Sequence, residues 1–309
     1  MKKINSLTTF LFITFFLNTM PYSPAYEARA RIVLLGDSIT QMSFSSGGFG
    51  AHLSDVYQRR ADVFNRGFSG YNTLWILELL QTEEGRHEIF GPPDESKTGD
   101  IPSGAVRLVT IFLGANDASD SKLNTRQHIS VCDYRLNLKK IVQIARTSCP
   151  HAKFIIVGPP PIHHEARLKY QVDRYGKEKA TGLLERTLSL SGEYSKACGE
   201  VASEMKLPFF DVWKEMQEAS PEPKWHEYLS DGLHLSRSGN EFVGNRLEKI
   251  IAEEIPEISV TPCKRTGFYG SSSSKCDDIP HAGPWHDAIK DPNNYQSLFS
   301  RKKQKTCGA

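Results

Sequence analysis

Between Arg31 and Ile255, short runs of apolar residues alternate with longer amphipathic stretches. Five short runs have the length and composition of buried strands, and they cover residues 31–35, 61–65, 106–113, 153–157 and 208–212. Two of the longer stretches carry apolar residues at helical spacing: Val131, Tyr134, Leu138, Ile141, Val142 and Ala145, and Phe242, Val243, Leu247, Ile250 and Ile251. Strands that alternate with helices predict an α/β fold, with a five-stranded parallel sheet covered on both faces. A span of this length fits a single domain over residues 31–255.

The first 30 residues have the pattern of a secretory signal peptide. Lys2 and Lys3 precede an apolar run over residues 7–17, and small residues at 23–25 and 28–30 offer cleavage sites. The run is shorter than the roughly 20 residues that a membrane-spanning helix needs. We therefore expect a soluble mature protein that is secreted or lies in an endomembrane lumen. The alternatives are an uncleaved anchor, a start assigned too far upstream, and an intracellular location.

Residues 256–309 lack the strand and helix alternation. They contain a serine run at 271–274, several Pro and Gly residues and a basic end at 301–305. This composition predicts a largely extended or flexible C-terminal tail without a function of its own, with Trp285 as a candidate docking residue. Cys263 and Cys276 flank the serine run and could form a disulfide.

Charge and composition exclude several classes of partner. The 38 Lys and Arg residues nearly balance 36 Asp and Glu residues, so a formal net charge of +2 leaves no basic excess for tracking phosphates. We therefore expect no nucleic-acid partner, and no obligate protein partner is evident. The six cysteines include no CxxC pair and no Cys/His spacing of the kind found in structural zinc sites.

Polar segments follow three of the predicted strands. They are residues 36–38 (Gly-Asp-Ser), 65–70 (Asn-Arg-Gly-Phe-Ser-Gly) and 114–117 (Gly-Ala-Asn-Asp). Because the carboxyl ends of parallel strands meet at one edge of a sheet, these segments are expected to converge there. A fourth segment, residues 231–234 (Asp-Gly-Leu-His), precedes the last amphipathic helix and can reach the same edge.

These segments supply the parts of a nucleophilic acyl-transfer site. Ser38 needs a base to remove its proton during attack, and the imidazole of His234 has a suitable proton affinity. Asp231, three residues before His234, can fix the imidazole tautomer and balance its charge. The backbone N–H groups of Ser38 and Gly67 and the side-chain amide of Asn116 can stabilise an oxyanion, with glycine at 67 allowing close approach.

In this order, the four segments resemble the blocks of the GDSL-type, or SGNH, hydrolases. The strings LLGDSITQ, NRGFSGYNT, IFLGANDA and YLSDGLHLS are similar to those of the isoamyl acetate-hydrolysing esterase group. The resemblance covers about residues 31–255, with PWHDAI in the tail as a further short match, and Ile39 stands where the family name has Leu. It implies a flavodoxin-like three-layer α/β/α SGNH hydrolase fold, the Ser38-His234-Asp231 triad, and oxyanion donors from Ser38, Gly67 and Asn116.

The sequence therefore predicts a serine carboxylic ester hydrolase that works through an acyl-enzyme, with a small-molecule ester as its substrate and no metal or organic cofactor. The resemblance suggests short-chain, acetate-type esters. A lipase, a thioesterase or a carbohydrate acetylesterase would use the same site. Outside enzymes, the alternatives are a flavodoxin-like ligand-binding module, which lacks the usual phosphate-binding loop motif, and a catalytically silent relative, which retention of all three triad residues disfavours.

Several neighbouring residues have structural interpretations. Ser69 is the rival nucleophile, but capping of the following helix suits it better. Asp37 can brace the turn at Ser38 by accepting backbone N–H groups, and Asp117 can support the loop of Asn116 or cap the segment after it. His163 and His164 follow the fourth predicted strand, where they could line the acyl pocket, lie in a solvated loop or bind a metal.

Overall fold

The computed structural model describes residues 28–93, 100–219, 224–271, 273–283 and 290. Nearly all of the predicted leader therefore lies outside the described residues, as do Trp285 and the basic C-terminal end. Among the helices of the described part, none combines the length and apolarity needed to cross a bilayer.

Five parallel strands form one sheet in the order β2-β1-β3-β4-β5. The strands are β1 (Ala30–Gly36), β2 (Ala61–Gly67), β3 (Val106–Phe112), β4 (Lys153–Val157) and β5 (Phe209–Phe210). All five predicted strands are confirmed, although β5 is only two residues long.

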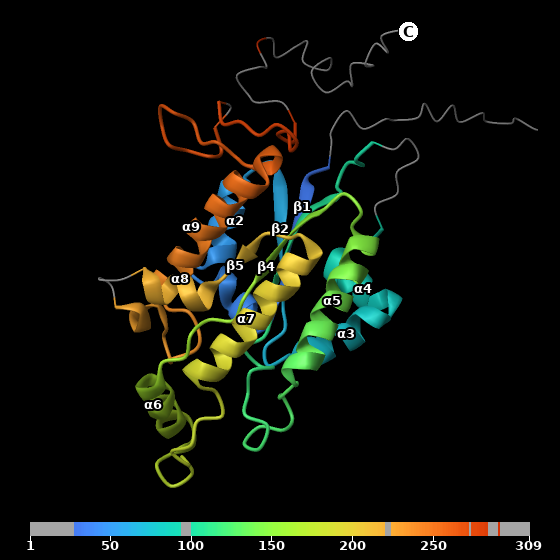
Figure 1. Cartoon of the computed structure of the whole chain (residues 1–309). Helices are drawn as coiled ribbons and strands as arrows, with labels where there is room; N and C mark the ends of the chain where they lie inside the picture. The colour runs from blue at the N-terminus through green and yellow to red at the C-terminus, as the bar shows by residue number, and fades with distance from the viewer. Residues whose placement is uncertain (1–27, 94–99, 220–223, 272, 284–289, 291–309) are drawn as a thin grey trace, which may run out of the picture. The chain divides into compact units, whose positions relative to one another are not determined.

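Helices pack on both faces of this sheet, which confirms the predicted three-layer arrangement (Figure 1). One face carries α2 (Phe49–Val56), α8 (Val212–Glu218) and α9 (Arg237–Glu254), and the other carries α3 (Thr73–Gln81), α4 (Glu83–Phe90), α5 (Val131–Ser148) and α7 (Leu188–Met205). The remaining elements are α1 (Ser38–Gln41), α6 (His164–Tyr175) and the 3-10 helices η1 (Met42–Phe44), η2 (Trp225–Tyr228) and η3 (Pro256–Ile258).

Strand β1 shows why the strands of this sheet appear in the sequence as continuous apolar runs. Ile32 and Leu34 belong to the core under α2 and α9, whereas Val33 and Leu35 belong to the core under α3 and α5. Successive side chains of a strand point to opposite faces, so a strand covered by helices on both sides must be apolar at every position.

The C-terminal tail is packed against the sheet domain as far as Ala282, and it belongs to the same compact unit. Within its described residues it contains an antiparallel bridge between Thr261 and Lys275. The buried guanidinium of Arg60 donates to the carbonyl oxygens of Ser274 (2.7 Å) and Ile279 (2.8 Å). This part of the tail therefore hydrogen-bonds a buried cation and covers an apolar surface of the sheet domain. The prediction that the tail as a whole is largely extended or flexible stays a prediction.

The cysteines that flank the serine run do not form the disulfide considered from sequence. Cys263 and Cys276 both have free thiols. The hydroxyl of Ser273 lies 2.9 Å from the sulfur of Cys263, and the thiol of Cys276 contacts the carbonyl oxygen of Glu257.

Asp117 joins the segment after β3 to the start of α3. Its buried carboxylate accepts from the backbone N–H of Thr73 at 3.0 Å and from the hydroxyl of the same residue. Burial raises the pKa of Asp117 to about 7, although the hydrogen bonds from Thr73 act in the opposite direction. This contact confirms the supporting role expected for Asp117, and it fixes the strand end next to it.

Replacing Ile279 tests whether the tail is part of the cooperative fold. Ile279 is 1% exposed, so Ile279→Ala should lower the free energy of unfolding by about 2–5 kcal/mol, as buried Ile truncations do. Leu183→Ala is the control, because Leu183 is 60% exposed and its loss should change stability by less than about 0.5 kcal/mol. Urea unfolding measures both, and equal values for the two variants would contradict the docked tail.

The buried carboxyl of Asp117 should make stability depend on pH. Because the folded protein holds this proton more tightly than the unfolded chain does, its contribution to the free energy of unfolding falls as pH rises from about 4 to about 7. Asp117→Asn removes this titration. The free energy of unfolding of the variant should therefore rise relative to that of the native protein as pH increases across this window, by at most about 1.4 kcal/mol per pH unit.

Denaturant unfolding at a series of pH values measures this difference. Asp120→Asn is the control, because backbone N–H groups of Lys122 and Leu123 lower the pKa of the exposed Asp120. It should therefore give no such slope above pH 5. A constant difference between Asp117→Asn and the native protein from pH 4 to pH 7 would show that the buried carboxyl does not titrate there.

Candidate active site

Ser38 begins α1 directly after β1. Asp37 is the N-cap of this helix, and its buried carboxylate accepts from the backbone N–H of Ile39 at 3.0 Å. This contact is the bracing role expected for Asp37. The first N–H groups of a helix have no partner inside the helix, so the backbone N–H of Ser38 points out of α1. Burial raises the pKa of Asp37 to about 6.

The three residues of the predicted triad lie within hydrogen-bond distance in series. The hydroxyl oxygen of Ser38 is 2.9 Å from Nε2 of His234, and Nδ1 of His234 is 2.8 Å from Oδ2 of Asp231. The structure thus joins two groups that are 196 positions apart in the chain.

The loop that carries Asp231 and His234 is held by its own hydrogen bonds. Oδ1 of Asp231 accepts from the backbone N–H groups of Leu233 (3.0 Å) and His234 (2.8 Å). The backbone N–H of His163 donates to the carbonyl oxygen of Gly232 at 2.9 Å, which ties the loop to the segment after β4. Together these contacts fix the carboxylate and the imidazole relative to each other.

Asp231 also binds a buried cation. Nη1 of Arg167, in α6, lies 2.9 Å from Oδ2, the oxygen that also faces His234. Burial would raise the pKa of Asp231, but the hydrogen bonds from His234 and the charges of His234 and Arg167 together hold it below its ordinary value. The carboxylate is therefore ionised at neutral pH, as a partner of an imidazolium needs to be. No sequence pattern singled out Arg167.

Asn116 follows β3 and is held at both ends of its side-chain amide. Nδ2 donates to the carbonyl oxygen of Tyr71 at 2.8 Å, and it lies 3.5 Å from Oδ2 of Asp37. Oδ1 accepts from Nε2 of Gln127 (3.1 Å) and Nη2 of Arg186 (3.0 Å). The nitrogen end of the amide consequently faces the turn that carries Ser38.

Gly67, the glycine predicted to supply an oxyanion donor, has another partner. Its backbone N–H donates to Oδ1 of Asn65 at 2.9 Å. A Cβ atom at this position would lie 2.0 Å from the backbone nitrogen of Gln41, so glycine is needed here for close packing of β2 against α1. Gly67 could donate to an oxyanion only after the side chain of Asn65 rotated away.

Gly70, three residues further on, lies beside Asn116 and was not singled out from the sequence. Nε2 of Gln127 donates both to the carbonyl oxygen of Gly70 (2.7 Å) and to Oδ1 of Asn116 (3.1 Å). The φ of 82° at Gly70 lies in the left-handed region that favours glycine. The signal in the sequence was the second glycine of NRGFSGYNT.

Ser69 does not cap the helix that follows it, contrary to our expectation. The N-cap of α3 is Asn72, whose side chain accepts from the backbone N–H of Trp75 at 2.9 Å. The backbone N–H of Ser69 instead donates to Oε1 of Gln41 at 2.8 Å. The cap therefore lies three residues later than predicted.

His163 packs in an aromatic cluster on the strand-end side of β4. Its ring stacks on His226 with centroids 4.6 Å apart and meets Trp225 edge-on at 5.7 Å. Its Nε2 lies 2.8 Å from a carboxylate oxygen of Glu165. Within the part of the chain that the structure describes, no three His, Cys, Asp or Glu side chains are arranged to hold a metal ion.

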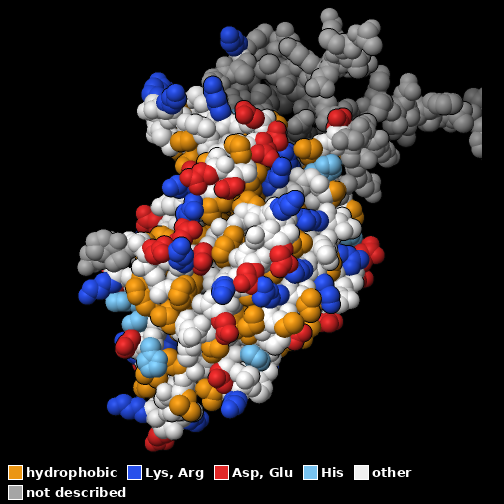
Figure 2. All heavy atoms as spheres, in the orientation of Figure 1, with side chains coloured by type: hydrophobic (Ala, Val, Ile, Leu, Met, Phe, Trp, Pro, Cys, Tyr) orange, Lys and Arg blue, Asp and Glu red, His pale blue; other side chains and the backbone are white. Residues whose placement is uncertain are grey.

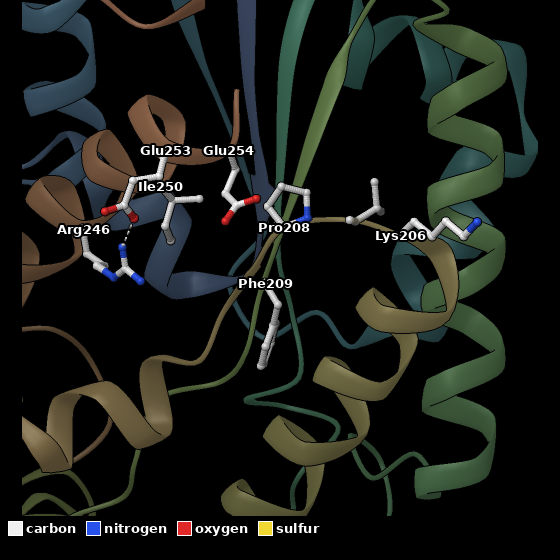
Figure 3. A pocket seen from close by; sticks show the side chains of 8 residues that line it. Lys206, Pro208, Phe209, Arg246, Ile250, Glu253 and Glu254 are labelled. Atoms are coloured by element: carbon white, nitrogen blue, oxygen red, sulfur yellow. Dashed lines mark hydrogen bonds and ion pairs between the residues drawn. The ribbon is translucent and has the colours of Figure 1, made fainter. Parts of the chain in front are cut away.

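A hollow of about 490 Å³ lies away from this site, beside the start of β5 (Figure 3). Pro208, Phe209 and Arg246 are among the residues that line it, and Arg246 is paired with Glu253 at 3.4 Å. The face drawn in Figure 2 mixes side chains of both charges with apolar ones, as the near-neutral composition predicts.

Comparison with known proteins agrees with the fold. The GDSL-like Lipase/Acylhydrolase family matches residues 34–242. A GDSL esterase/lipase of Arabidopsis thaliana is 42% identical over 228 residues, covering 73% of this chain and 87% of that protein. The isoamyl acetate-hydrolyzing esterase 1 homolog of Homo sapiens is 38% identical over 232 residues, covering 74% and 84%.

Among solved structures, the acetylxylan esterase Axe2 of Geobacillus stearothermophilus is similar in fold. Its TM-score is 0.52 at 18% identity, and the match covers 73% of this chain and 95% of that one. The family match spans most of the sheet domain and includes Ser38, Asn116 and His234. The chain therefore belongs to the GDSL-like lipase/acylhydrolase family and is an enzyme of the GDSL esterase/lipase type.

Proposed function

We propose that the protein hydrolyses short-chain carboxylic esters, with Ser38 as nucleophile, His234 as general base and Asp231 as its orienting carboxylate. The observation that carries this proposal is the 2.9 Å approach of the Ser38 hydroxyl to Nε2 of His234. A serine hydroxyl is a weak nucleophile until a base takes its proton, and this distance suits that transfer.

The reaction has two halves. Ser38 attacks the acyl carbon while its proton passes to Nε2 of His234, and the imidazolium then gives that proton to the departing alkoxide. Water next enters the same place, loses a proton to His234 and attacks the acyl-serine, which releases the acid and restores the hydroxyl. Asp231 keeps the proton of the imidazole on Nδ1, so Nε2 faces Ser38 with its lone pair.

The oxyanion formed in each half needs donors that are already in place. We assign the backbone N–H of Ser38 and Nδ2 of Asn116 to this role. For the third donor we favour the backbone N–H of Gly70 over that of Gly67, because the Gly67 N–H is bound by Asn65. Gly70 is linked to Asn116 through Gln127.

Short esters are favoured by the similarity to isoamyl acetate-hydrolyzing esterase 1 homologs. Lipids, thioesters and acetylated sugars are the competing substrate classes, since the same residues would act on each of them. The aromatic rings of Phe68 and Tyr71, with centroids 5.3 Å apart, lie in the segment after β2 and suit a small apolar acyl or alcohol group.

Labelling with a fluorophosphonate followed by peptide mapping tests the proposal. We expect the label on Ser38, and Ser38→Ala should abolish labelling and lower the rate by about 10⁶ without unfolding the protein. Ser69→Ala, the control at the rival serine, should label and turn over like the native enzyme. Labelling at another residue would overturn the proposal.

Replacing Asn116 tests the oxyanion assignment separately. Asn116→Ala should lower kcat about 10² to 10³-fold and change KM little, because the donor acts on charge that develops in the transition state. Steady-state kinetics on p-nitrophenyl acetate give both constants. A higher KM at unchanged kcat would mean that Asn116 binds substrate instead.

A series of p-nitrophenyl esters from acetate to palmitate tests the substrate class. The proposal predicts the highest kcat/KM at acetate or butyrate, with a fall as the acyl chain lengthens. A maximum at long chains would replace the short-ester assignment with a lipase.

A further inference from the structure

Arg186 is a buried cation directly behind the proposed oxyanion donor. It precedes α7, and only 6% of its surface is exposed. Its Nε donates to the carbonyl oxygen of Ala115 at 2.9 Å, and its Nη2 donates to Oδ1 of Asn116 at 3.0 Å. One guanidinium therefore binds both the backbone and the side chain of the segment that follows β3.

These contacts determine which way the amide of Asn116 points. Nη2 of Arg186 and Nε2 of Gln127 are both donors, so only the oxygen of the Asn116 amide can face them. Arg186 also donates to Oε1 of Gln127 at 2.8 Å, which fixes that amide in turn. A flip of Asn116 would place its NH₂ group against a guanidinium and lose a charge-assisted hydrogen bond.

The charge of Arg186 also acts on the site. Its carboxylate partner, Glu185, binds Nη1, whereas Asn116 binds Nη2. The side chain of Glu185 is 35% exposed, so water screens this partner more than the buried guanidinium. A positive charge on the oxygen end of an amide draws electrons from its nitrogen and makes its N–H groups better donors. In a buried setting this field is strong compared with that of a surface charge.

We propose that Arg186 is a positioning residue for ester hydrolysis: it holds the amide of Asn116 with Nδ2 toward the oxyanion and strengthens Nδ2 as a donor. This inference rests on the proposed function, because it requires Asn116 to act on the oxyanion. Arg186 would touch no substrate atom and would act through Asn116.

Arg107 provides a matched control for a purely structural role. It is also 6% exposed, and it binds Asp278 through an ion pair at 2.9 Å and a backbone carbonyl contact. It lies at the start of β3, at the opposite edge of the sheet from Ser38. Removing its guanidinium should cost stability without changing the chemistry.

The experiment compares Arg186→Met, Arg186→Lys and Arg107→Met with the native enzyme on p-nitrophenyl acetate. Arg186→Met should lower kcat about 10- to 100-fold with KM within about threefold, since a misplaced donor loses transition-state contacts. Arg186→Lys keeps the charge and should recover part of this loss. Arg107→Met should keep the native kcat at a temperature where it is folded.

A double-mutant cycle shows whether Arg186 acts through Asn116. In an Asn116→Ala background, Arg186→Met should lower kcat less than about threefold further, because the group that it positions is gone. An undiminished effect in that background, or a kcat for Arg186→Met equal to that of Arg107→Met, would overturn the inference. If Arg186→Met does not fold, the effect of Arg186→Lys on kcat is compared in the native and Asn116→Ala backgrounds instead, with the same outcomes supporting or overturning the inference.

Kinetics of the Asn116 and Arg186 variants distinguish failure of the oxyanion assignment from failure of the proposed role of Arg186. If Asn116→Ala leaves kcat unchanged, the oxyanion assignment under the proposed function fails, and this inference fails with it. If Asn116→Ala is slow but both Arg186 variants keep the native kcat, only the inference is wrong.

Discussion

The site depends on the parallel pairing of β1 with both of its neighbours. Gly36 at the end of β1 pairs with Gly67 of β2 and with Phe112 of β3, so all three strands end at the same level. The chain then leaves β1 into α1, β2 into the turn before α3, and β3 into the segment of Asn116. β2 lies on one side of β1, whereas β3, β4 and β5 lie on the other, so the chain connections change direction at β1. Such a switch point opens a crevice at the carboxyl edge of a sheet.

His234 reaches this edge without a strand of its own. Its loop closes on itself through a bridge between Leu229 and Leu235 and through the backbone N–H of Ser230, which donates to the carbonyl oxygen of His234 at 2.8 Å. The loop is then held from the side by α6, whose Arg167 binds Asp231. Two arginines therefore lie behind the candidate site: Arg167 contacts the carboxylate of Asp231, and Arg186 contacts the amide of Asn116.

Much of this could be predicted from the sequence, because burial on both faces leaves continuous apolar runs that identify strands. The runs at 106–113 and 153–157 match β3 and β4 closely, whereas the run at 208–212 overstates β5, since Pro208 and Asp211 flank only two paired residues. Ser38, Asp231 and His234 could be proposed from the sequence because each lies in a short segment with the residue types that the chemistry needs, and the structure brings them within hydrogen-bond distance in series.

The rest depended on contacts that no local pattern records. Two glycines lie in NRGFSGYNT, and their hydrogen bonds distinguish them: the side chain of Asn65 binds the Gly67 N–H, whereas Gln127 binds the carbonyl oxygen of Gly70. Asn72, not Ser69, caps α3, because β2 continues to Gly67 and α3 begins only at Thr73. Arg167 and Arg186 gave no signal, since a single arginine in a polar segment is usually solvated, and the packing of the tail depends on a buried cation, Arg60, far away in the chain.

The structure of the enzyme after reaction with a small phosphonate ester tests the nucleophile and the oxyanion donors together, because the adduct resembles the tetrahedral intermediate. The account predicts phosphorus bound to the Ser38 oxygen, and a phosphoryl oxygen about 2.7–3.1 Å from both Nδ2 of Asn116 and the backbone nitrogen of Ser38. A phosphoryl oxygen turned to solvent, with no contact from Nδ2 of Asn116, would contradict it.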